Sequence, residues 1–262
     1  MAETLAGITV VVTRPAHQAQ PLCQLIEANG GTILRFPVLE IAGPRDATVV
    51  TETVRHLAEF DIAIFISPNA VQWGMKFVAA SGGFPLGIQV AAVGRGSARE
   101  LAKNGIEPDI FPSQQYNSEA LLAMHQMQQV AGKRIIIFRG ESGRELLADS
   151  LRERGAVVEY VECYRRVQPD IDPAPLVESL NRDKVDIITV TSNEGLQNLV
   201  NMVSDSARSK LMALPLIVVS ERSQILASEL GFQGPVIVSK QPSDEALLNA
   251  IIDWHTDSGQ IR

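Results

Sequence analysis

The stretch Val11-Val12-Thr13-Arg14 decides the fold, because it returns later in the chain as Ile136-Ile137-Phe138-Arg139. In each copy a glycine, Gly30 or Gly155, follows the arginine by sixteen residues. Two similar halves predict two similar lobes, and a cleft between lobes is where ligands usually bind. The repeat continues in order, with Phe65–Asn69 matching Val190–Asn193, Ala91–Gly105 matching Ile217–Gly231, and Asn117–Leu122 matching Pro242–Leu248.

The composition is typical of a folded, soluble protein. The chain has 262 residues, of which 45% are hydrophobic and 20% are charged. No apolar run is long enough to span a membrane, and the first residues lack the pattern of a signal peptide. The two cysteines, Cys23 and Cys163, lie in apolar patterns and are interpreted as buried free thiols rather than a reactive pair. We therefore expect a cytoplasmic protein without a membrane partner.

The charge balance narrows the class of ligand. A formal net charge of −7, with no basic run, argues against a nucleic-acid partner. It does not argue against a small anion, since a few arginines and backbone amides inside a cleft bind carboxylates even when the outer surface is acidic.

Short apolar strands alternate with amphipathic helices along the whole chain. The β-branched run Ile8–Val12 is typical of a strand that is buried on both faces, and a helix closed by Asn29-Gly30-Gly31 follows it. This alternation predicts an α/β fold with a doubly wound parallel sheet in each lobe. Further strands are expected near 33–36, 62–66, 89–93, 135–138, 157–161, 187–191, 216–219 and 236–238. Further helices are expected near 71–80, 97–104, 119–131, 144–154, 176–181, 195–203, 223–230 and 244–254.

Two segments are interpreted as crossings between the lobes. Residues 37–44 are extended with a proline at each end, and residues 164–175 carry Pro169, Pro173 and Pro175, which exclude a helix interior. If both segments cross, residues 1–37 plus 168–262 form one discontinuous lobe and residues 41–164 form an inserted lobe. A simple split near residue 131 fits the sequence equally well.

Residues of one chemical kind stand where the expected strands end. Ligands of doubly wound sheets bind beyond the carboxyl ends of the strands, where helix N-termini supply N–H donors and partial positive charge. Hydroxyls, amides, glycines and arginines at these places suit a ligand with several negative groups. The candidate ligand-binding residues are Thr13, Arg14, Ser67, Asn69, Gly94, Arg95, Ser97, Asn117, Arg139, Gly140, Thr191, Ser192, Asn193, Ser220 and Ser223.

Each of these signals has a structural alternative. Serine and asparagine before a helix are first of all N-caps, and the two arginines could be ordinary surface residues. Gly94 and Gly96 lack the third glycine of a dinucleotide fingerprint. Acidic residues near one strand end, Glu141, Glu145 and Glu162, fit a solvated helix start or a solvated edge.

Patterns for metal binding or covalent catalysis are missing from the sequence. The four histidines are scattered, and none has metal-ligand spacing to another histidine or to a cysteine. No nucleophile elbow, Walker loop or Cys–His set occurs. We expect no metal and no cofactor.

Tyr164 is the candidate catalytic residue. It ends an expected strand and begins the proline-rich crossing, so its phenol could project into the cleft and donate a proton or hydrogen bond to a departing hydroxyl. Packing of the ring at the hinge is the structural alternative.

Taken in order, these pieces resemble uroporphyrinogen-III synthase over essentially the full length. The resemblance is strongest from Phe138-Arg139-Gly140 to Gly143-Arg144-Glu145-Leu146-Leu147 and at Tyr164-Arg165-Arg166. It also includes Thr13-Arg14-Pro15, Phe65–Val71, Val93-Gly94 with Ser97-Ala98, Thr191-Ser192 with Gly195, and Pro242-Ser243 with Ala246–Leu248. One departure is Ser220-Glu221-Arg222-Ser223, where the family usually has a glycine- and threonine-rich loop.

The resemblance implies two lobes joined by a two-stranded connection, and a monomeric lyase without a cofactor. Its implied substrate is the linear tetrapyrrole hydroxymethylbilane, which it closes to uroporphyrinogen III while inverting ring D and releasing water. Two rival hypotheses stay open on the residues alone. One is a two-lobed binding protein for a small polyanion, without chemistry. The other is a sugar-phosphate or nucleotide enzyme, which would need a phosphate loop or an acidic metal ligand.

Overall fold

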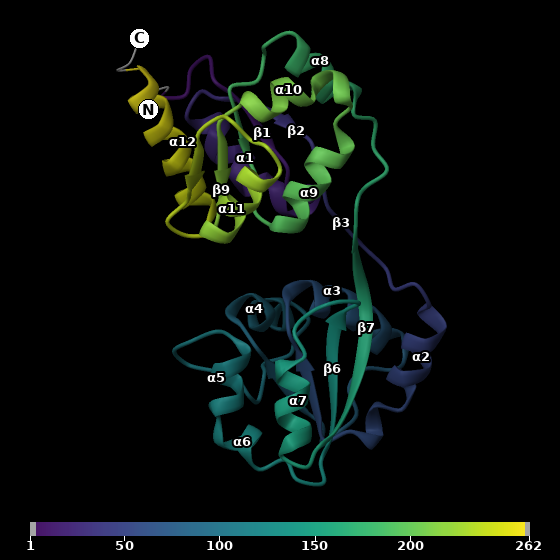
Figure 1. Cartoon of the computed structure of the whole chain (residues 1–262). Coiled ribbons are helices and arrows are strands. Elements are labelled where there is room, and N and C mark those ends of the chain that lie inside the picture. Colours follow the sequence, from purple (N-terminus) through teal and green to yellow (C-terminus); the bar gives the residue numbers. More distant parts are fainter. Residues whose placement is uncertain (1–3, 260–262) are drawn as a thin grey trace. The chain divides into compact units, whose positions relative to one another are not determined.

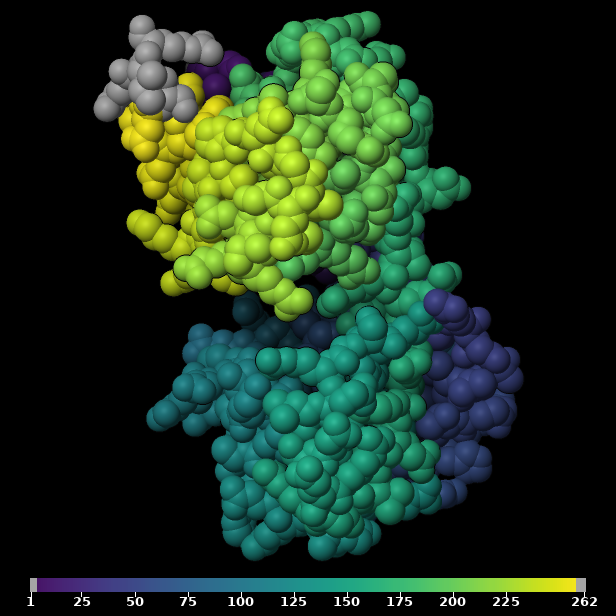
Figure 2. All heavy atoms as spheres, in the orientation of Figure 1, coloured from purple at the N-terminus to yellow at the C-terminus, as the bar shows by residue number. Residues whose placement is uncertain are grey.

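The computed structural model describes residues 4–259, which form two compact units (Figure 1). Residues 4–40 and 167–259 belong to the first unit, and Ile41–Arg166 form the second. The chain passes between the units twice, at residues 40–41 and 166–167, where the predicted lobes have their boundaries at 37–41 and 164–168. Figure 2 shows the heavy atoms of each unit as spheres, closely filled on the visible face.

The first unit contains a parallel sheet in the order β10-β9-β8-β1-β2. Its strands are β1 (Thr9–Val12), β2 (Thr32–Arg35), β8 (Ile187–Thr189), β9 (Leu216–Val218) and β10 (Val236–Val238). Its helices are α1 (Ala16–Ala28), α8 (Ala174–Asn181), α9 (Asn193–Met202), α10 (Asp205–Ala213), α11 (Glu221–Glu229) and α12 (Asp244–Gly259).

Side chains alternate along each strand, so they point to both faces of this sheet. Both faces are buried against helices. Val11 joins a core with the residues of α8 to α11, whereas Val10 and Val12 join a core with the residues of α1 and α12. This arrangement is the doubly wound α/β fold that the β-branched run of β1 predicts, and the strand order reverses between β1 and β8.

The second unit has the sheet order β3-β7-β6-β4-β5, in which β7, β6, β4 and β5 pair in parallel. Its strands are β3 (Glu40–Ala42), β4 (Ile62–Phe65), β5 (Gln89–Ala92), β6 (Arg134–Gly140) and β7 (Val157–Val167). Its helices are α2 (Ala47–Arg55), the short 3₁₀ helix η1 (Leu57–Glu59), α3 (Pro68–Ala80), α4 (Arg95–Lys103), α5 (Ser118–Ala123), α6 (His125–Gln128) and α7 (Leu146–Glu153).

The internal repeat of the sequence is a repeat of topology. The order β7-β6-β4-β5 repeats the order β2-β1-β8-β9, and an isolated parallel bridge between Ala91 and Ile110 stands where β10 follows β9. The strand order of the second unit therefore reverses between β6 and β4, as it does between β1 and β8 in the first.

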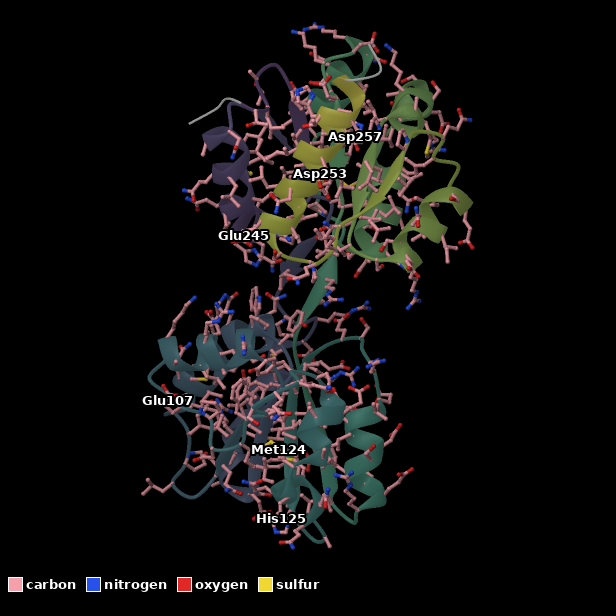
Figure 3. All side chains as sticks on the ribbon, turned by 90° about the vertical axis from the view of Figure 1, so that its left-hand side faces the viewer. Glu107, Met124, His125, Glu245, Asp253 and Asp257 are labelled. Atoms are coloured by element: carbon pink, nitrogen blue, oxygen red, sulfur yellow. The ribbon has the colours of Figure 1, made fainter. Side chains whose placement is uncertain are left out.

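One predicted helix is wrong in detail. The expected helix over 119–131 is two helices, α5 and α6, separated at Met124, whose ψ is 143° (Figure 3). Leu121, Leu122, Met127 and Val130 all enter one core. At about 100° per residue these four side chains would point in very different directions from one straight helix, so the break allows all of them to be buried.

Candidate functional site

In the first unit, the strand-order reversal lies between the ends of β1 and β8. The Thr13 hydroxyl, 2% exposed, donates to the backbone carbonyl of Thr189 at 2.7 Å, and the Thr189 hydroxyl donates to the carbonyl of Val11 at 3.2 Å. Thr13 thus ties the two strand ends together. Thr191 follows β8 closely and is partly exposed.

Arg14, next to Thr13, is held by a carboxylate. One of its terminal nitrogens donates to Asp244, the first residue of α12, and both side chains are mostly buried. The predicted ligand-facing arginine therefore has an internal partner from a segment 230 residues away. Sequence inspection missed Asp244, because nothing local marks it as the partner of Arg14.

Hydroxyl groups connect the ends of β8 and β9. Ser192 and Ser220 are N-caps of α9 and α11 and accept from the backbone N–H groups of Gly195 and Ser223. The buried Ser223 hydroxyl donates to the Asn193 side-chain oxygen at 2.7 Å and lies 2.8 Å from the Ser220 hydroxyl. The structure brings these residues together, and capping is one of their functions.

In the second unit, the corresponding reversal lies between β6 and β4. Gly140 ends β6, and Ser67 follows β4 as the N-cap of α3. Tyr164, on β7, is 4% exposed and places its hydroxyl 3.2 Å from the Ser67 hydroxyl. A Cβ added to Gly140 would lie 2.9 Å from the Tyr164 ring, so only glycine leaves room for this ring. The candidate catalytic phenol therefore stands at the carboxyl end of the second sheet.

Arg139 is buried and paired with Glu145. Its guanidinium, 3% exposed, donates to Glu145 at 2.8 Å and to the carbonyl of Gly140 at 3.2 Å, and it lies 4.4 Å from the centre of the Tyr160 ring. The Tyr160 hydroxyl donates to the other oxygen of Glu145. The expectation that a solvated helix start explains Glu145 is thus incomplete, since this carboxylate also holds Arg139.

A cavity of about 140 Å³ opens beside Arg139. Ile66, Ile137 and Leu147 are among its apolar lining residues, and Ser118, Arg139 and Arg144 are polar residues of the lining. Tyr160, which lines the same cavity, was not among the sequence candidates. Its signal is weak, because it sits in an ordinary strand alternation.

The Tyr160 hydroxyl, and secondarily Arg139, hold the pKa of Glu145 below its ordinary value of 4.5. A lowered folded-state pKa stabilises the fold above pH 4.5, and this contribution is lost as pH falls through the lowered value. We expect wild type to exceed Glu145→Gln in stability by a constant amount above about pH 5.5, and by a shrinking amount below about pH 4.5. Urea unfolding midpoints across this range measure the difference.

The matched variant for this pH prediction is Tyr160→Phe, which removes the hydrogen bond that lowers the pKa of Glu145 most. It should move the acid loss of stability upward in pH. A difference between wild type and Glu145→Gln that stays constant down to about pH 3 would contradict the assignment.

The remaining candidates of the second unit surround the starts of α3, α4 and α5. Arg95 is exposed, with its guanidinium carbon 4.3 Å from the centre of the Tyr116 ring, and Ser97 is buried in the first turn of α4. Asn117 caps α5 by accepting from the N–H of Ala120. Gly94 is the N-cap of α4, and Asn69 is the second residue of α3.

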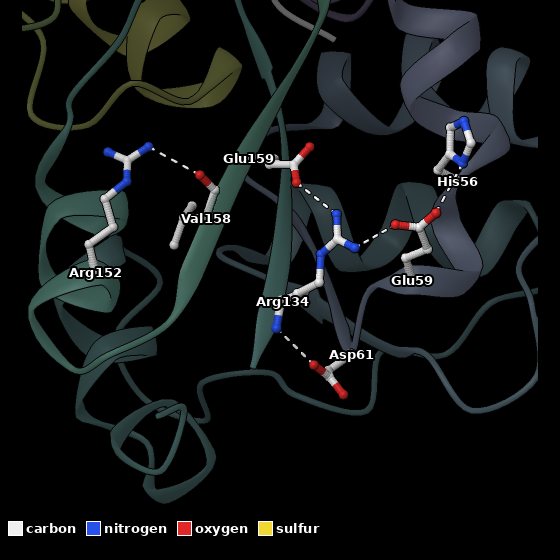
Figure 4. Close-up of polar contacts among 7 residues, drawn as sticks. All are labelled: His56, Glu59, Asp61, Arg134, Arg152, Val158 and Glu159. Carbon is white, nitrogen blue, oxygen red and sulfur yellow. Dashed lines mark hydrogen bonds and ion pairs between the residues drawn. The ribbon is translucent and has the colours of Figure 1, made fainter. Parts of the chain in front are cut away.

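A separate polar cluster lies at the other end of β6. Arg134, the first residue of this strand, pairs with Glu59 and Glu159, and Glu59 also contacts His56 (Figure 4). Hydrogen bonds from Arg134 and then from His56 lower the pKa of Glu59. Acidic side chains also line α12 of the first unit at Glu245, Asp253 and Asp257 (Figure 3). The charged residues at the carboxyl ends of the strands are different from these: they include Arg14 with Asp244 and Arg139 with Glu145.

The cysteines are buried free thiols, as predicted. Burial raises the pKa of Cys163 to about 12 and also raises that of Cys23, so both are poor nucleophiles at neutral pH. Within residues 4–259 no group of three or more His, Cys, Asp or Glu side chains is arranged to hold a metal ion. In the same part of the chain, no helix combines the length and apolar character that crossing a membrane requires.

Two doubly wound units place the chain in the parallel α/β class, whose ligands bind beyond the carboxyl ends of the strands. Residues 20–249 match the family described as uroporphyrinogen-III synthase HemD. The chain belongs to this family.

Sequence relatives agree with that assignment. The chain is 32% identical over 246 residues to a uroporphyrinogen-III synthase of Salmonella typhimurium, and 31% identical over 246 residues to one of Escherichia coli. Each comparison covers 93% of this chain and 100% of the relative.

Solved structures show the same fold. The uroporphyrinogen-III synthetase of Helicobacter pylori superposes with a TM-score of 0.61 at 15% identity, covering 94% of this chain and 99% of that one. A mutant uroporphyrinogen III synthase of Thermus thermophilus gives 0.58 at 20% identity, covering 96% and 99%. At these identities the likeness concerns the fold alone.

Proposed function

We propose that this chain cyclises hydroxymethylbilane to uroporphyrinogen III, with inversion of ring D and loss of water, in tetrapyrrole biosynthesis. The observation that carries the proposal is the family match over residues 20–249. The placement of the Tyr164 hydroxyl at the carboxyl end of the second sheet supports it, because ligands of such sheets bind there.

In the proposed reaction, the ring A hydroxyl leaves first. The pyrrole nitrogen of ring A supplies the electron pair that breaks the carbon–oxygen bond, while Tyr164 donates a hydrogen bond or proton to the departing oxygen. Water and a protonated azafulvene result; the azafulvene keeps its N–H proton and carries the positive charge. Ring D then attacks through its already substituted carbon, the spiro intermediate fragments, and the rings reclose with ring D turned over. The final loss of a proton from carbon restores the Tyr164 phenol.

Binding is proposed to use the strand-end residues of both units. The substrate carries eight carboxylates, and α3, α4, α9 and α11 all begin at strand ends, where free N–H groups favour anions. Arg95, Asn69 and Thr191 have exposed or partly exposed side chains that can add donors. Arg14 and Arg139 each have an internal carboxylate partner, so we assign them a smaller share of the charge.

In this proposal the main role of the protein is to position the substrate. Hydroxymethylbilane also closes unaided to the uninverted isomer, so the protein must hold the chain in the inverting geometry and assist loss of the hydroxyl. This chemistry needs no nucleophile or cofactor. We further propose that the protein acts as a monomer in the cytoplasm. The two free cysteines support the assignment to this reducing compartment. Sedimentation tests the oligomeric state.

Consumption of hydroxymethylbilane, followed by separation of the product isomers, tests the function. We expect purified protein to speed consumption and to yield the type III isomer in place of type I. A binding protein without chemistry would instead slow the spontaneous reaction and leave type I as the product. That result would contradict the proposal.

A further inference from the structure

The Tyr164 hydroxyl is held by a serine whose own geometry is fixed. The Ser67 oxygen accepts from the backbone N–H of Ala70 at 3.0 Å and lies 3.2 Å from the Tyr164 oxygen. A serine hydroxyl has one hydrogen and two lone pairs. Since Ala70 occupies one lone pair, the remaining lone pair and the hydrogen are left for Tyr164.

This pair can exist in two states. Either Tyr164 donates to Ser67, or Ser67 donates to Tyr164. In the second state the phenol hydrogen is free for another acceptor, and the Tyr164 oxygen receives a hydrogen bond that stabilises negative charge as the proton is given up. Because Ser67 caps α3, the partial positive charge of that helix N-terminus acts in the same direction.

We propose that Ser67 is a positioning residue for Tyr164: it donates to the phenol oxygen while the phenol donates to the departing substrate oxygen. This inference rests on the proposed function. It gives Ser67 a task different from the direct substrate contact that the sequence suggested.

The backbone next to Tyr164 restricts where its hydroxyl can lie. The β6–β7 register shifts between Arg139 and Gly140, and Gly140 pairs with Tyr164. The Tyr164 ring occupies the space that a Cβ at residue 140 would need, since an added Cβ would lie 2.9 Å from two ring carbons. The ring therefore rests on Gly140 while its hydroxyl faces Ser67.

The first unit shows that a serine can cap a helix at this position without a tyrosine hydroxyl beside it, unlike the Ser67–Tyr164 pair. Ser192 caps α9 with the same extended backbone as Ser67, its φ being −158° against −156°. Val38 approaches Gly195 at the start of α9, as Cys163 contacts Ala70 at the start of α3. The residue after Val38 is Leu39, whereas the residue after Cys163 is Tyr164. The phenol is thus an addition to a cap that functions without one.

A double-mutant cycle tests the inference. Ser67→Gly removes the hydroxyl but keeps an acceptable N-cap residue. We expect it to lower kcat about fivefold, the size of one net hydrogen bond, with KM little changed. Ser67→Thr retains the hydroxyl and should recover most of the loss. In the double variant with Tyr164→Phe, Ser67→Gly should have no further effect, because its partner is already missing.

Controls separate a lost cap from a lost partner. Asp46→Gly removes the capping side chain of α2 in the same unit and should leave kcat unchanged. Gly140→Ala offers a second route: by displacing the Tyr164 ring it should lower kcat rather than raise KM.

Three results would overturn the inference: an unchanged kcat in Ser67→Gly, a rise in KM alone, or the same fivefold loss in the Tyr164→Phe background. The last two would mean that Ser67 contacts the substrate itself. Wild-type turnover in Tyr164→Phe alone would instead remove the proposed catalytic role of the tyrosine, so the two failures are distinguishable.

Discussion

Tyr164→Phe should lower kcat about 100-fold while KM stays within about twofold, because positioned acid–base groups typically contribute at least that much. Phenylalanine keeps the ring that packs on Gly140 and removes only the hydroxyl that faces Ser67. The loss should therefore fall on the step in which the substrate hydroxyl departs.

Steady-state kinetics with hydroxymethylbilane measure this prediction, after subtraction of the spontaneous reaction. The matched control is Tyr116→Phe, since the Tyr116 hydroxyl donates to the carbonyl of Ser113 on the surface and its ring contact with Arg95 survives the change. Equal kcat values for Tyr164→Phe and wild type would remove the tyrosine from the mechanism.

Phe138→Ala should reduce the free energy of unfolding by about 3–5 kcal/mol. Phe138 is fully buried in β6 and stacks on Phe65 of β4, with ring centres 4.4 Å apart. A Cβ on Gly74 would lie 2.7 Å from its ring, so the surroundings are closely packed and cannot collapse into the cavity without cost. Because the chain continues from β4 to Ser67 and β6 ends at Gly140, this core supports the candidate site.

Thermal unfolding tests the packing prediction. For a unit of this size we expect the transition midpoint of Phe138→Ala to fall by roughly 10 °C. Leu86→Ala, at a fully exposed position, serves as the control and should change stability by less than about 0.5 kcal/mol. A shift for Phe138→Ala no larger than for Leu86→Ala would contradict the close packing of this core.

The strands were predictable because their signal is local and strong. The β-branched run at the start of the chain and its repeat at Ile135–Phe138 are buried on both sheet faces, and such strands are continuous apolar runs. The matching order of elements then predicted two similar α/β folds, which the structure and its relatives confirm.

Two α-helices of the described residues were missed, and α2 shows why. Residues 47–55 are rich in threonine and valine, which are weak helix formers. The helix is instead supported by Asp46, whose carboxylate accepts from the N–H groups of Thr48 and Val49, and by burial of Val50 and Val54. Tertiary packing overrides propensity here. The other missed helix, α10, likewise buries Ala207 and Leu211.

The positions of the candidate site residues at strand ends followed from the alternation of elements, but their partners did not. Arg14 with Asp244 and Ser67 with Tyr164 are separated by 230 and 97 residues. Such contacts depend on strand order and on side-chain rotamers, neither of which local patterns encode. The Tyr164 hydroxyl was expected to face a cleft, and its contact with Ser67 was not foreseen.

The central claim is that this protein redirects a substrate that already closes by itself. The most direct measurement is the fraction of type III isomer formed from a fixed amount of hydroxymethylbilane as the protein concentration increases. We predict a fraction that rises with protein concentration until type III is nearly the only product. A mixture of isomers that does not change with protein concentration would contradict the claim.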